Sequence, residues 1–391
     1  MTVVAALLHA LQLAFFMFWE VLWPLALGFL LSALVQSVIS RRAVERSLGS
    51  DSVASAALAT GLGAASSSCS YAAVAVARSL FTRGASFANA ILFEFASTNL
   101  VFELGLVLLI LLGWPFVGAQ FAGGVLMVVI LLAIFRLTLR KPLLQSARAQ
   151  AERRVRGRME GHGEMDMAVT EGPLLRRVFS ARGLTAISHY FWMDVYSLWQ
   201  DLLLGFLIAG ALAAWVPNSF WHAFFLTDNA AAARIWGPLV GPIIAMLSFV
   251  CSVGNVPLAA VLWNGGISFG GVISFIFADL LILPILNIYR KYYGLRMMVY
   301  LTAASYIAMV LSGFVVDAIF EAFRWAPAHF TVEVFESTPQ LNYTTVLDLV
   351  FLALSVLLGW RFLRTGGAQM LRMMNSAPGE HQAEMSEAHS H

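Results

Sequence analysis

The chain has 391 residues, of which 60% are hydrophobic and 12% are charged, and its mean hydropathy is +0.78. Soluble domains typically carry about 25% charged residues, so this composition excludes an ordinary soluble globular protein. The net charge of +2 says little by itself. We therefore expect an all-α integral membrane protein.

Apolar blocks along the chain are long enough to cross a bilayer, which takes roughly 20 residues in an α-helix. Because no Lys or Arg precedes Arg41, the first block lacks the charged region of a signal peptide and is predicted to be a permanent span. The blocks occupy residues 11–39, 86–135, 195–216, 267–289, 297–320 and 346–360.

Two further stretches, 53–81 and 234–263, are each compatible with one long span or with a re-entrant hairpin of two half-helices. The second is interrupted around Gly254 and Pro257, and both residue types weaken a helix. The first is rich in serine next to Cys69, and serine hydroxyls can satisfy backbone groups freed by a helix break. Each stretch would turn near its cysteine.

The two halves of the chain resemble each other without gaps at an offset of 182 residues. Between residues 69–96 and 251–278, 12 of the 28 aligned positions are identical, and the cysteines Cys69 and Cys251 coincide. Apolar composition alone would give roughly three or four identities. Duplicated halves are the usual construction of secondary transporters.

The distribution of positive charge favours the hairpin interpretation. With two hairpins, 21 of the 24 basic residues fall on the cytoplasmic side, and only Arg234 and Arg324 lie outside, with Arg78 inside a hairpin. Two full spans would instead move ten basic residues outside. In the hairpin model, each repeat has three spans plus one broken or re-entrant helix. This odd number of spans inverts the second copy relative to the first.

The expected organisation follows from this topology, with an extra C-terminal span after the second repeat. Its parts are a first membrane repeat at 1–140, a cytoplasmic loop at 141–190, a second membrane repeat at 191–320, an external loop and final span at 321–366, and a cytoplasmic tail at 367–391.

The cysteines are the first candidates for chemistry. Both lie at predicted helix breaks of inverted repeats, which approach each other near the midplane and line the transport site. Thiolates prefer soft, thiophilic centres, although a lone cysteine in an apolar helix is usually a small buried hydrophobe. The substrate-binding candidates are Cys69, Ser70, Cys251, Ser252, Gly254 and Asn255. Local capping of the break is the alternative role for the polar members.

Ionisable residues inside the spans are the next candidates, because charge at membrane depth is costly and is usually functional or paired. Glu94 and Asp279 could each load a coupling proton. Glu103, Asp201 and Asp317 are expected to be polar lining or to lie near the interface, and Glu20 is a further ionisable residue in a span.

Several other chemistries lack their motifs. The chain has no Walker loop for ATP and no His-Glu-x-x-His metalloprotease motif. The serines at 66–70 have no nearby His or Lys base. We therefore expect no enzyme activity, no cofactor and no nucleic acid partner, with energy supplied by an ion gradient or by a partner.

Histidine and methionine are concentrated in the polar parts. The segment with His162, Met165 and Met167 could bind a soft metal or could be a disordered loop. The tail holds His381, His389 and His391 and is expected to be disordered.

The run Phe-Val-Cys-Ser-Val-Gly-Asn-Val-Pro-Leu-Ala, from Phe249 to Ala259, resembles a signature of the predicted permeases that include the ArsP organoarsenical efflux proteins. Similar features are Gly266–Gly271, Phe277–Leu280 and Ser188–Asp194, and the resemblance covers about residues 10–300. It implies a multi-pass permease of the cytoplasmic (inner) membrane that extrudes trivalent organoarsenicals, with cysteine handling the arsenic. Relatives often have Cys-Ser-Cys where this chain has Cys69-Ser70-Tyr71.

Three alternatives stay open at this point. They are a permease for an unrelated small solute, a membrane scaffold or sensor that responds to a metal through its Met- and His-bearing loop, and a membrane-embedded enzyme. The substrate, the coupling ion, the transport direction and the assembly of several copies into an oligomer do not follow from the sequence.

Overall fold

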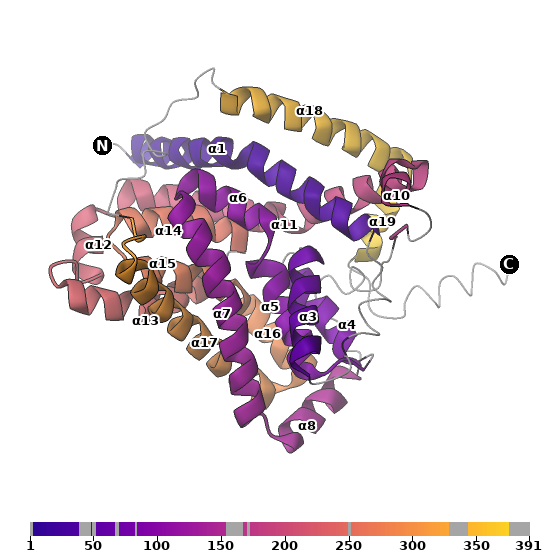
Figure 1. The fold of residues 1–391 in the computed structure, drawn as a ribbon. Coiled ribbons are helices and arrows are strands. Elements are labelled where there is room, and N and C mark those ends of the chain that lie inside the picture. Colours follow the sequence, from indigo (N-terminus) through magenta and orange to yellow (C-terminus); the bar gives the residue numbers. More distant parts are fainter. Residues whose placement is uncertain are drawn as a thin grey trace.

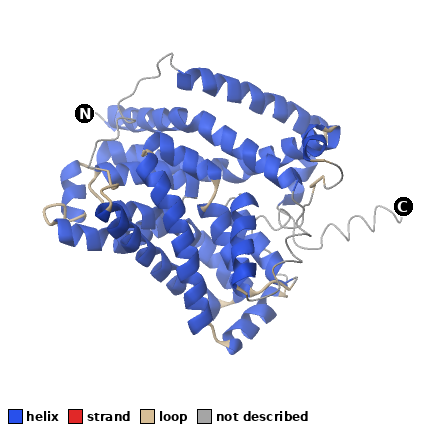
Figure 2. Cartoon of the chain, in the orientation of Figure 1, coloured by secondary structure: helices blue, strands red, loops and turns tan. Residues whose placement is uncertain are grey.

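The computed structural model of the protein is predominantly helical in the part of the chain that it describes, and that part contains no strand (Figure 2). It describes residues 3–38, 48, 52–66, 70–82, 84–153, 167–169, 173–248, 252–327 and 343–374. Five helices are long and apolar enough to cross a membrane, or up to eight if three bent helix pairs each count as one span. This confirms the expected all-α integral membrane protein.

The first half contains seven described helices (Figure 1). They are α1 (Val3–Val38), α3 (Val53–Ser66), α4 (Ser70–Thr82), α5 (Phe87–Asn99), α6 (Phe102–Leu111), α7 (Trp114–Thr138) and α8 (Lys141–Ala151). Helix α1 bends by 45° near residue 20, where Pro24 leaves a backbone carbonyl without its helical donor.

The second half continues the helical chain to residue 374. Its elements are α10 (Leu174–Phe179), α11 (Ala181–Trp215), α12 (Asn218–Phe224), α13 (Ala230–Ser248), α14 (Ser252–Asn264), α15 (Phe269–Ile276), the 3-10 helix η1 (Phe277–Leu281), α16 (Leu283–Tyr293), α17 (Leu295–Ala322), α18 (Tyr343–Arg364) and α19 (Gly367–Met374). Helices α8, α10 and α19 fall in segments that the sequence predicted to be a cytoplasmic loop or tail. Helix α11 begins ten residues before the expected start of the second repeat at 191.

The segments α3 and α4 run in opposite directions beside α5. Near the start of α5, the Asn89 amide donates to Ser55 Oγ at the beginning of α3 (2.9 Å). Farther along α5, a Cβ added at Gly63 would lie 2.3 Å from the Phe93 carbonyl oxygen, so α3 runs parallel to α5. Helix α4 ends at Thr82, just before α5 begins. The chain therefore enters along α3 and returns along α4 to the same end of α5.

The segments α13 and α14 have the same relation to α15. Cβ atoms added at Gly237 and Gly241 would contact Ser268 and Gly271 in turn, so α13 runs parallel to α15. Thr227, just before α13, lies against Gly266, just after α14. This second hairpin also enters and returns at one end, although α13, with 19 residues, is longer than the half-helix expected there.

The helix boundaries of the two hairpins repeat at the 182-residue offset. Helices α3 and α13 end at Ser66 and Ser248, and α4 and α14 begin at Ser70 and Ser252. The following helices α5 and α15 are capped alike, because Ser86 and Ser268 each accept from the backbone amide three residues later. Gly84 and Gly266 each have a positive φ, +110° and +94°, which a residue with a Cβ rarely adopts.

Equivalent helices begin at opposite ends of α7. The ring of Phe87, at the start of α5, lies 6.0 Å from the ring of Phe135 near the end of α7. The ring of the equivalent Phe269, at the start of α15, lies 4.9 Å from Phe116 near the start of α7. The equivalent helix starts thus lie near opposite ends of α7, and the inverted arrangement of the repeats stays a prediction.

The remaining long helices flank this centre. Helices α1 and α11 lie antiparallel, since Trp215 near the end of α11 donates to the carbonyl of Ala6 near the start of α1 (3.1 Å). Helix α18 lies beside α1 on the outer side of the bundle (Figure 1), where the Asp348 carboxyl accepts from the Trp23 backbone amide. These helices cover the region between the two hairpins, so polar side chains there are shielded from the surroundings of the bundle.

Candidate functional site

Buried polar side chains meet where the first hairpin tip, the end of α5, η1 and α16 come together. We call this group the polar centre. It comprises Ser70, Glu94, Thr98, Asn99, Gln120, Asp279 and Tyr289, and each of these side chains is fully buried. Because a buried polar group is costly unless it is paired, such a concentration inside an apolar bundle marks a site rather than ordinary packing.

Asp279 joins the two halves of the chain. Its carboxyl oxygens accept a hydrogen bond from the Ser70 hydroxyl at the start of α4 (2.9 Å) and one from the Asn99 amide at the end of α5 (3.1 Å). The neighbouring Thr98 hydroxyl donates to the Phe95 carbonyl (3.3 Å). A carboxyl from the second repeat is therefore held by donors from the first.

Glu94 is the second carboxyl of the polar centre. Its Oε1 accepts a short hydrogen bond from the Tyr289 hydroxyl of α16, and its Oε2 is buried without a partner. Asp279 is close enough to interact with it electrostatically. Among the described residues, neither carboxyl is paired with Lys, Arg or His, so the centre holds two buried acidic groups without a cationic partner.

Two amides extend the centre toward α7. The Gln120 amide nitrogen donates to the backbone carbonyl of Asn99 (3.0 Å), while the Asn99 amide nitrogen faces Asp279 and Thr98. The side-chain oxygens of both amides are buried without a hydrogen-bond partner. This part of the site therefore has more acceptors than donors.

The second hairpin tip has a different polarity. Asn255 lies in the first turns of α14, fully buried, and its Oδ1 accepts from the Ser248 hydroxyl at the end of α13 (3.2 Å). Its amide nitrogen has no partner. Ser252 and Gly254 are buried in the same turns, and α14 packs against η1, which carries Asp279. The structure thus brings Ser70 and both candidate carboxyls into one group, while Asn255 lies on the helix α14 that packs against η1.

Other candidates fall elsewhere. Cys69 and Cys251, with His162, Met165 and the tail histidines, lie outside the described residues, as do the side chains of Glu20 and Asp201. Met167 lies beside α11, where its backbone amide donates to the Tyr190 hydroxyl. The described residues contain no cluster of three or more His, Cys, Asp or Glu side chains that could hold a metal.

Asp317 and Glu103 lie away from the polar centre. Asp317 pairs with Arg234 (3.0 Å) and accepts from the Gly270 backbone amide, which ties α13, α15 and α17 together. Glu103 lies where α6 crosses α1 closely at Gly28. Neither residue belongs to the polar centre.

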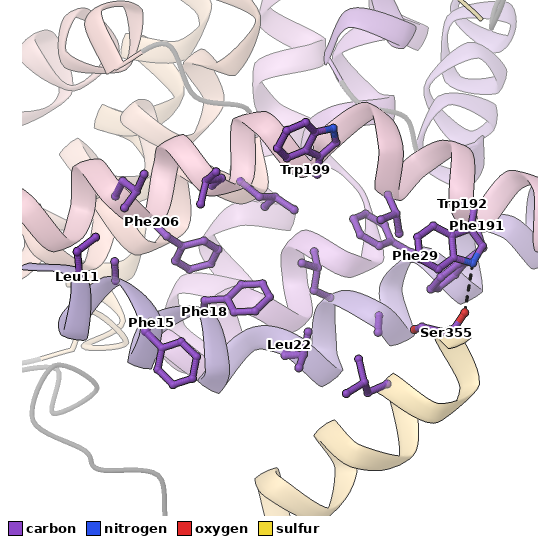
Figure 3. Close-up of a pocket in the computed structure, with 18 residues that line it drawn as sticks. Leu11, Phe15, Phe18, Leu22, Phe29, Phe191, Trp192, Trp199, Phe206 and Ser355 are labelled. Carbon is purple, nitrogen blue, oxygen red and sulfur yellow. Dashed lines mark hydrogen bonds between the residues drawn. The ribbon is translucent and has the colours of Figure 1, made fainter. Parts of the chain in front are cut away.

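A large apolar groove also lies away from the polar centre. It has a volume of about 530 Å³ and opens between α1, α11 and α18 (Figure 3). Aromatic rings such as Phe15, Phe18 and Phe206 line it, and it shares no residue with the polar centre. A surface of this composition at a helix interface is suited to acyl chains rather than to polar solutes.

Sequence reasoning missed several members of the centre. Asn99 and Gln120 lie in apolar blocks, so the argument that selected the carboxylates would have selected these amides as well. Tyr289 and Thr98 could not be selected from the sequence in this way. Tyr289 precedes basic residues, and a tyrosine in that position is typical of a membrane interface.

Comparison with known proteins identifies the family. Residues 6–318 match the ArsP_1 family of predicted permeases. The chain belongs to this family. It is also 54% identical over 342 residues to a protein of Mycobacterium tuberculosis (strain ATCC 25618 / H37Rv) named "Putative permease Rv2963", covering 87% of this chain and 84% of that protein. No solved structure matches the present chain. The family resemblance expected from the Cys251 motif is thereby confirmed, and the chain is a multi-pass membrane permease.

Proposed function

We propose that this permease exports a small soft or thiophilic solute, such as a trivalent organoarsenical, across the cytoplasmic (inner) membrane at the expense of an ion gradient. The observation that carries the proposal is the polar centre, in which Ser70 of one repeat binds Asp279 of the other (2.9 Å). Broken helices that meet at a buried site are the usual substrate and ion sites of secondary transporters.

The cysteines supply the soft ligands in this proposal. Cys69 directly precedes Ser70, and Cys251 directly precedes Ser252, so each is one residue from the start of a hairpin's returning helix. Ser70, Ser252, Gly254 and Asn255 complete the substrate site with hydroxyl, backbone and amide groups. Two thiolates near the axis between the repeats would hold one trivalent centre.

Glu94 and Asp279 provide the energy coupling. Each is fully buried, and together they can take up or release positive charge as the site changes the side to which it opens. The orientation follows from the basic residues, with the N-terminus outside and the C-terminus in the cytoplasm. No role in catalysis is needed.

Flux measurements test the proposal. Everted membrane vesicles that contain the protein should accumulate a trivalent methyl- or phenylarsenical when energised. This accumulation should stop when the ion gradient is collapsed. Vesicles that contain the Asp279→Asn variant are the matched control. Accumulation no greater than in empty vesicles, across arsenicals, antimonite and copper, would contradict the function.

The paired thiolates make a separate prediction. Cys69→Ser and Cys251→Ser should each lose most of the resistance that the protein confers, because one remaining thiolate is a weak ligand for a trivalent centre. The double variant should lose little more. Growth in arsenical and immunoblots of the membrane fraction measure this. Normal resistance in both single variants would reduce the cysteines to packing residues, and failure of Cys251→Ser alone would reject the pairing.

A further inference from the structure

We propose that the polar centre binds a monovalent metal cation, with Na⁺ the best-fitting ion, and that Glu94, Asn99 and Gln120 supply oxygen ligands to it. This inference deepens the proposed function and rests on it in one respect, since the bound cation would be the coupling ion. Binding itself can be measured without transport.

The first support is a surplus of acceptors. Three side-chain oxygens of the centre are buried without a hydrogen-bond partner: Glu94 Oε2, Asn99 Oδ1 and Gln120 Oε1. The opposite atoms of the same side chains are occupied, by Tyr289, Asp279 and the Asn99 carbonyl respectively. Leaving three acceptors unsatisfied in a dry interior is costly, and a cation bound in the polar centre would relieve that cost.

These oxygens belong to one connected group. Asn99 bonds to Asp279, Gln120 bonds to Asn99, and Glu94 interacts electrostatically with Asp279. The links run through α5, α7 and η1, so three elements fix the group in place. All three free oxygens come from the first repeat, and Asp279 of the second repeat holds the Asn99 amide in place.

The second support is charge. Two buried carboxyls share the centre, and no described Lys, Arg or His pairs with either. Buried carboxylates without a cationic partner are strongly disfavoured. Asn99 is also the last residue of α5, and the negative end of the helix dipole favours a cation there.

The ligand set distinguishes among positive ions. A proton on Glu94 would add a single donor and could satisfy only one of the two amide oxygens, whereas a metal cation can contact both. Divalent ions favour several free carboxylate oxygens. Here Asp279 is already held by donors, and one Glu94 oxygen is held by Tyr289. One remaining carboxylate oxygen with two neutral amide oxygens suits a monovalent ion.

The test is direct binding of ²²Na⁺ to the purified full-length protein in detergent, with choline as the inert cation. Saturable binding is expected, with Li⁺ competing better than the larger K⁺. Thermal stability should rise with Na⁺ concentration and not with choline, because a ligand that binds the folded state stabilises it.

Substitutions at Gln120 sharpen this test. Gln120→Met keeps the length of the side chain and removes its oxygen, so Na⁺ affinity should fall about tenfold or more. Gln120→Glu retains an oxygen ligand and should keep or increase the affinity. The matched control is Gln150→Met on α8, where Gln150 donates to the Lys291 carbonyl away from the centre; its Na⁺ affinity should not change.

The outcomes separate the two proposals. Absence of saturable Na⁺ binding, or equal affinity in the wild type and Gln120→Met, would overturn the cation site. Flux that persists without Na⁺ would leave the permease standing and reject Na⁺ as the coupling ion. Na⁺ binding in a protein without flux of any soft solute would keep the site and contradict the proposed function.

Discussion

The two hairpins agree in the end of the first arm and in both ends of the returning arm, but they differ in polar chemistry. Ser66 and Ser248 end their first arms, and the returning arms begin at Ser70 and Ser252. The first tip reaches Asp279, whereas the position equivalent to Asp279 in the first repeat is Ser97. The two copies therefore share the path of the backbone. They differ in whether an acidic side chain is present at the equivalent position.

The second hairpin tip carries a polar side chain that the first hairpin lacks. Asn255 presents an unpartnered amide nitrogen, and its equivalent in the first repeat is Ala73. The polar centre is therefore rich in acceptors, whereas the second hairpin tip carries a free donor. A substrate held between them would be asymmetric in its hydrogen bonding, even though the scaffold around it is nearly symmetric.

The largest effect is expected from Asp279→Asn. The change keeps the size of the side chain and removes the charge that the Ser70 hydroxyl and the Asn99 amide serve. Hydrogen bonds to charged groups contribute about 1.5–3 kcal/mol each, so the change at two of them should abolish measurable transport, a fall of about 100-fold or more. Initial rates in energised everted vesicles measure this. Near-normal rates would show that the charge at this position is dispensable.

The next effect is expected from Asn255→Leu. Leu is similar in size and has neither the donor nor the Oδ1 atom that accepts from Ser248, so transport should be abolished while membrane insertion is unchanged. Ser248→Ala is the informative partner, because it removes only the internal hydrogen bond and should retain partial flux. If Asn255→Leu transports normally, Asn255 is a dispensable cap of the helix break.

The smallest effect is expected at two glycines of α3. A Cβ at Gly63 would lie 2.3 Å from the Phe93 carbonyl oxygen, so Gly63→Ala must separate α3 from α5. We expect a loss of about 1–3 kcal/mol in stability, which is typical of overpacking. Gly61→Ala is the control, because nothing lies within 4 Å of its Cβ position. Thermal melts in detergent compare them, and equal melting temperatures would place α3 farther from α5.

Much of the fold could be predicted from the sequence, because it depends on patterns that repeat. Apolar block length predicted the long helices, while the helix breaks predicted at Cys69 and Cys251 fall between helices, outside the described residues. Helix α8 was missed, because its polar composition is also that of a solvated loop. Its Ala151 carbonyl accepts from the buried Arg78 side chain, and this tertiary contact has no signature in the sequence.

The site was only partly predictable for a similar reason. Glu94 and Asp279 stood out as charges in apolar segments, but their partners depend on how distant helices cross. Tyr289 bonds to Glu94 across 195 positions of the chain, and Ser70 bonds to Asp279 across 209. No local pattern encodes such pairs. The surplus of acceptors became visible only when the partners of every amide atom were known.

Cysteine labelling can show whether the two hairpins enter the bundle from opposite sides of the membrane. In a background carrying Cys69→Ser and Cys251→Ser, one exposed cysteine is placed at the end of each hairpin, by Thr82→Cys or by Asp228→Cys. A membrane-impermeant maleimide should label the Asp228→Cys protein in intact cells and the Thr82→Cys protein only in everted vesicles. Labelling of both proteins from the same side would contradict the inverted arrangement, and with it the meeting of two opposed tips at one polar centre.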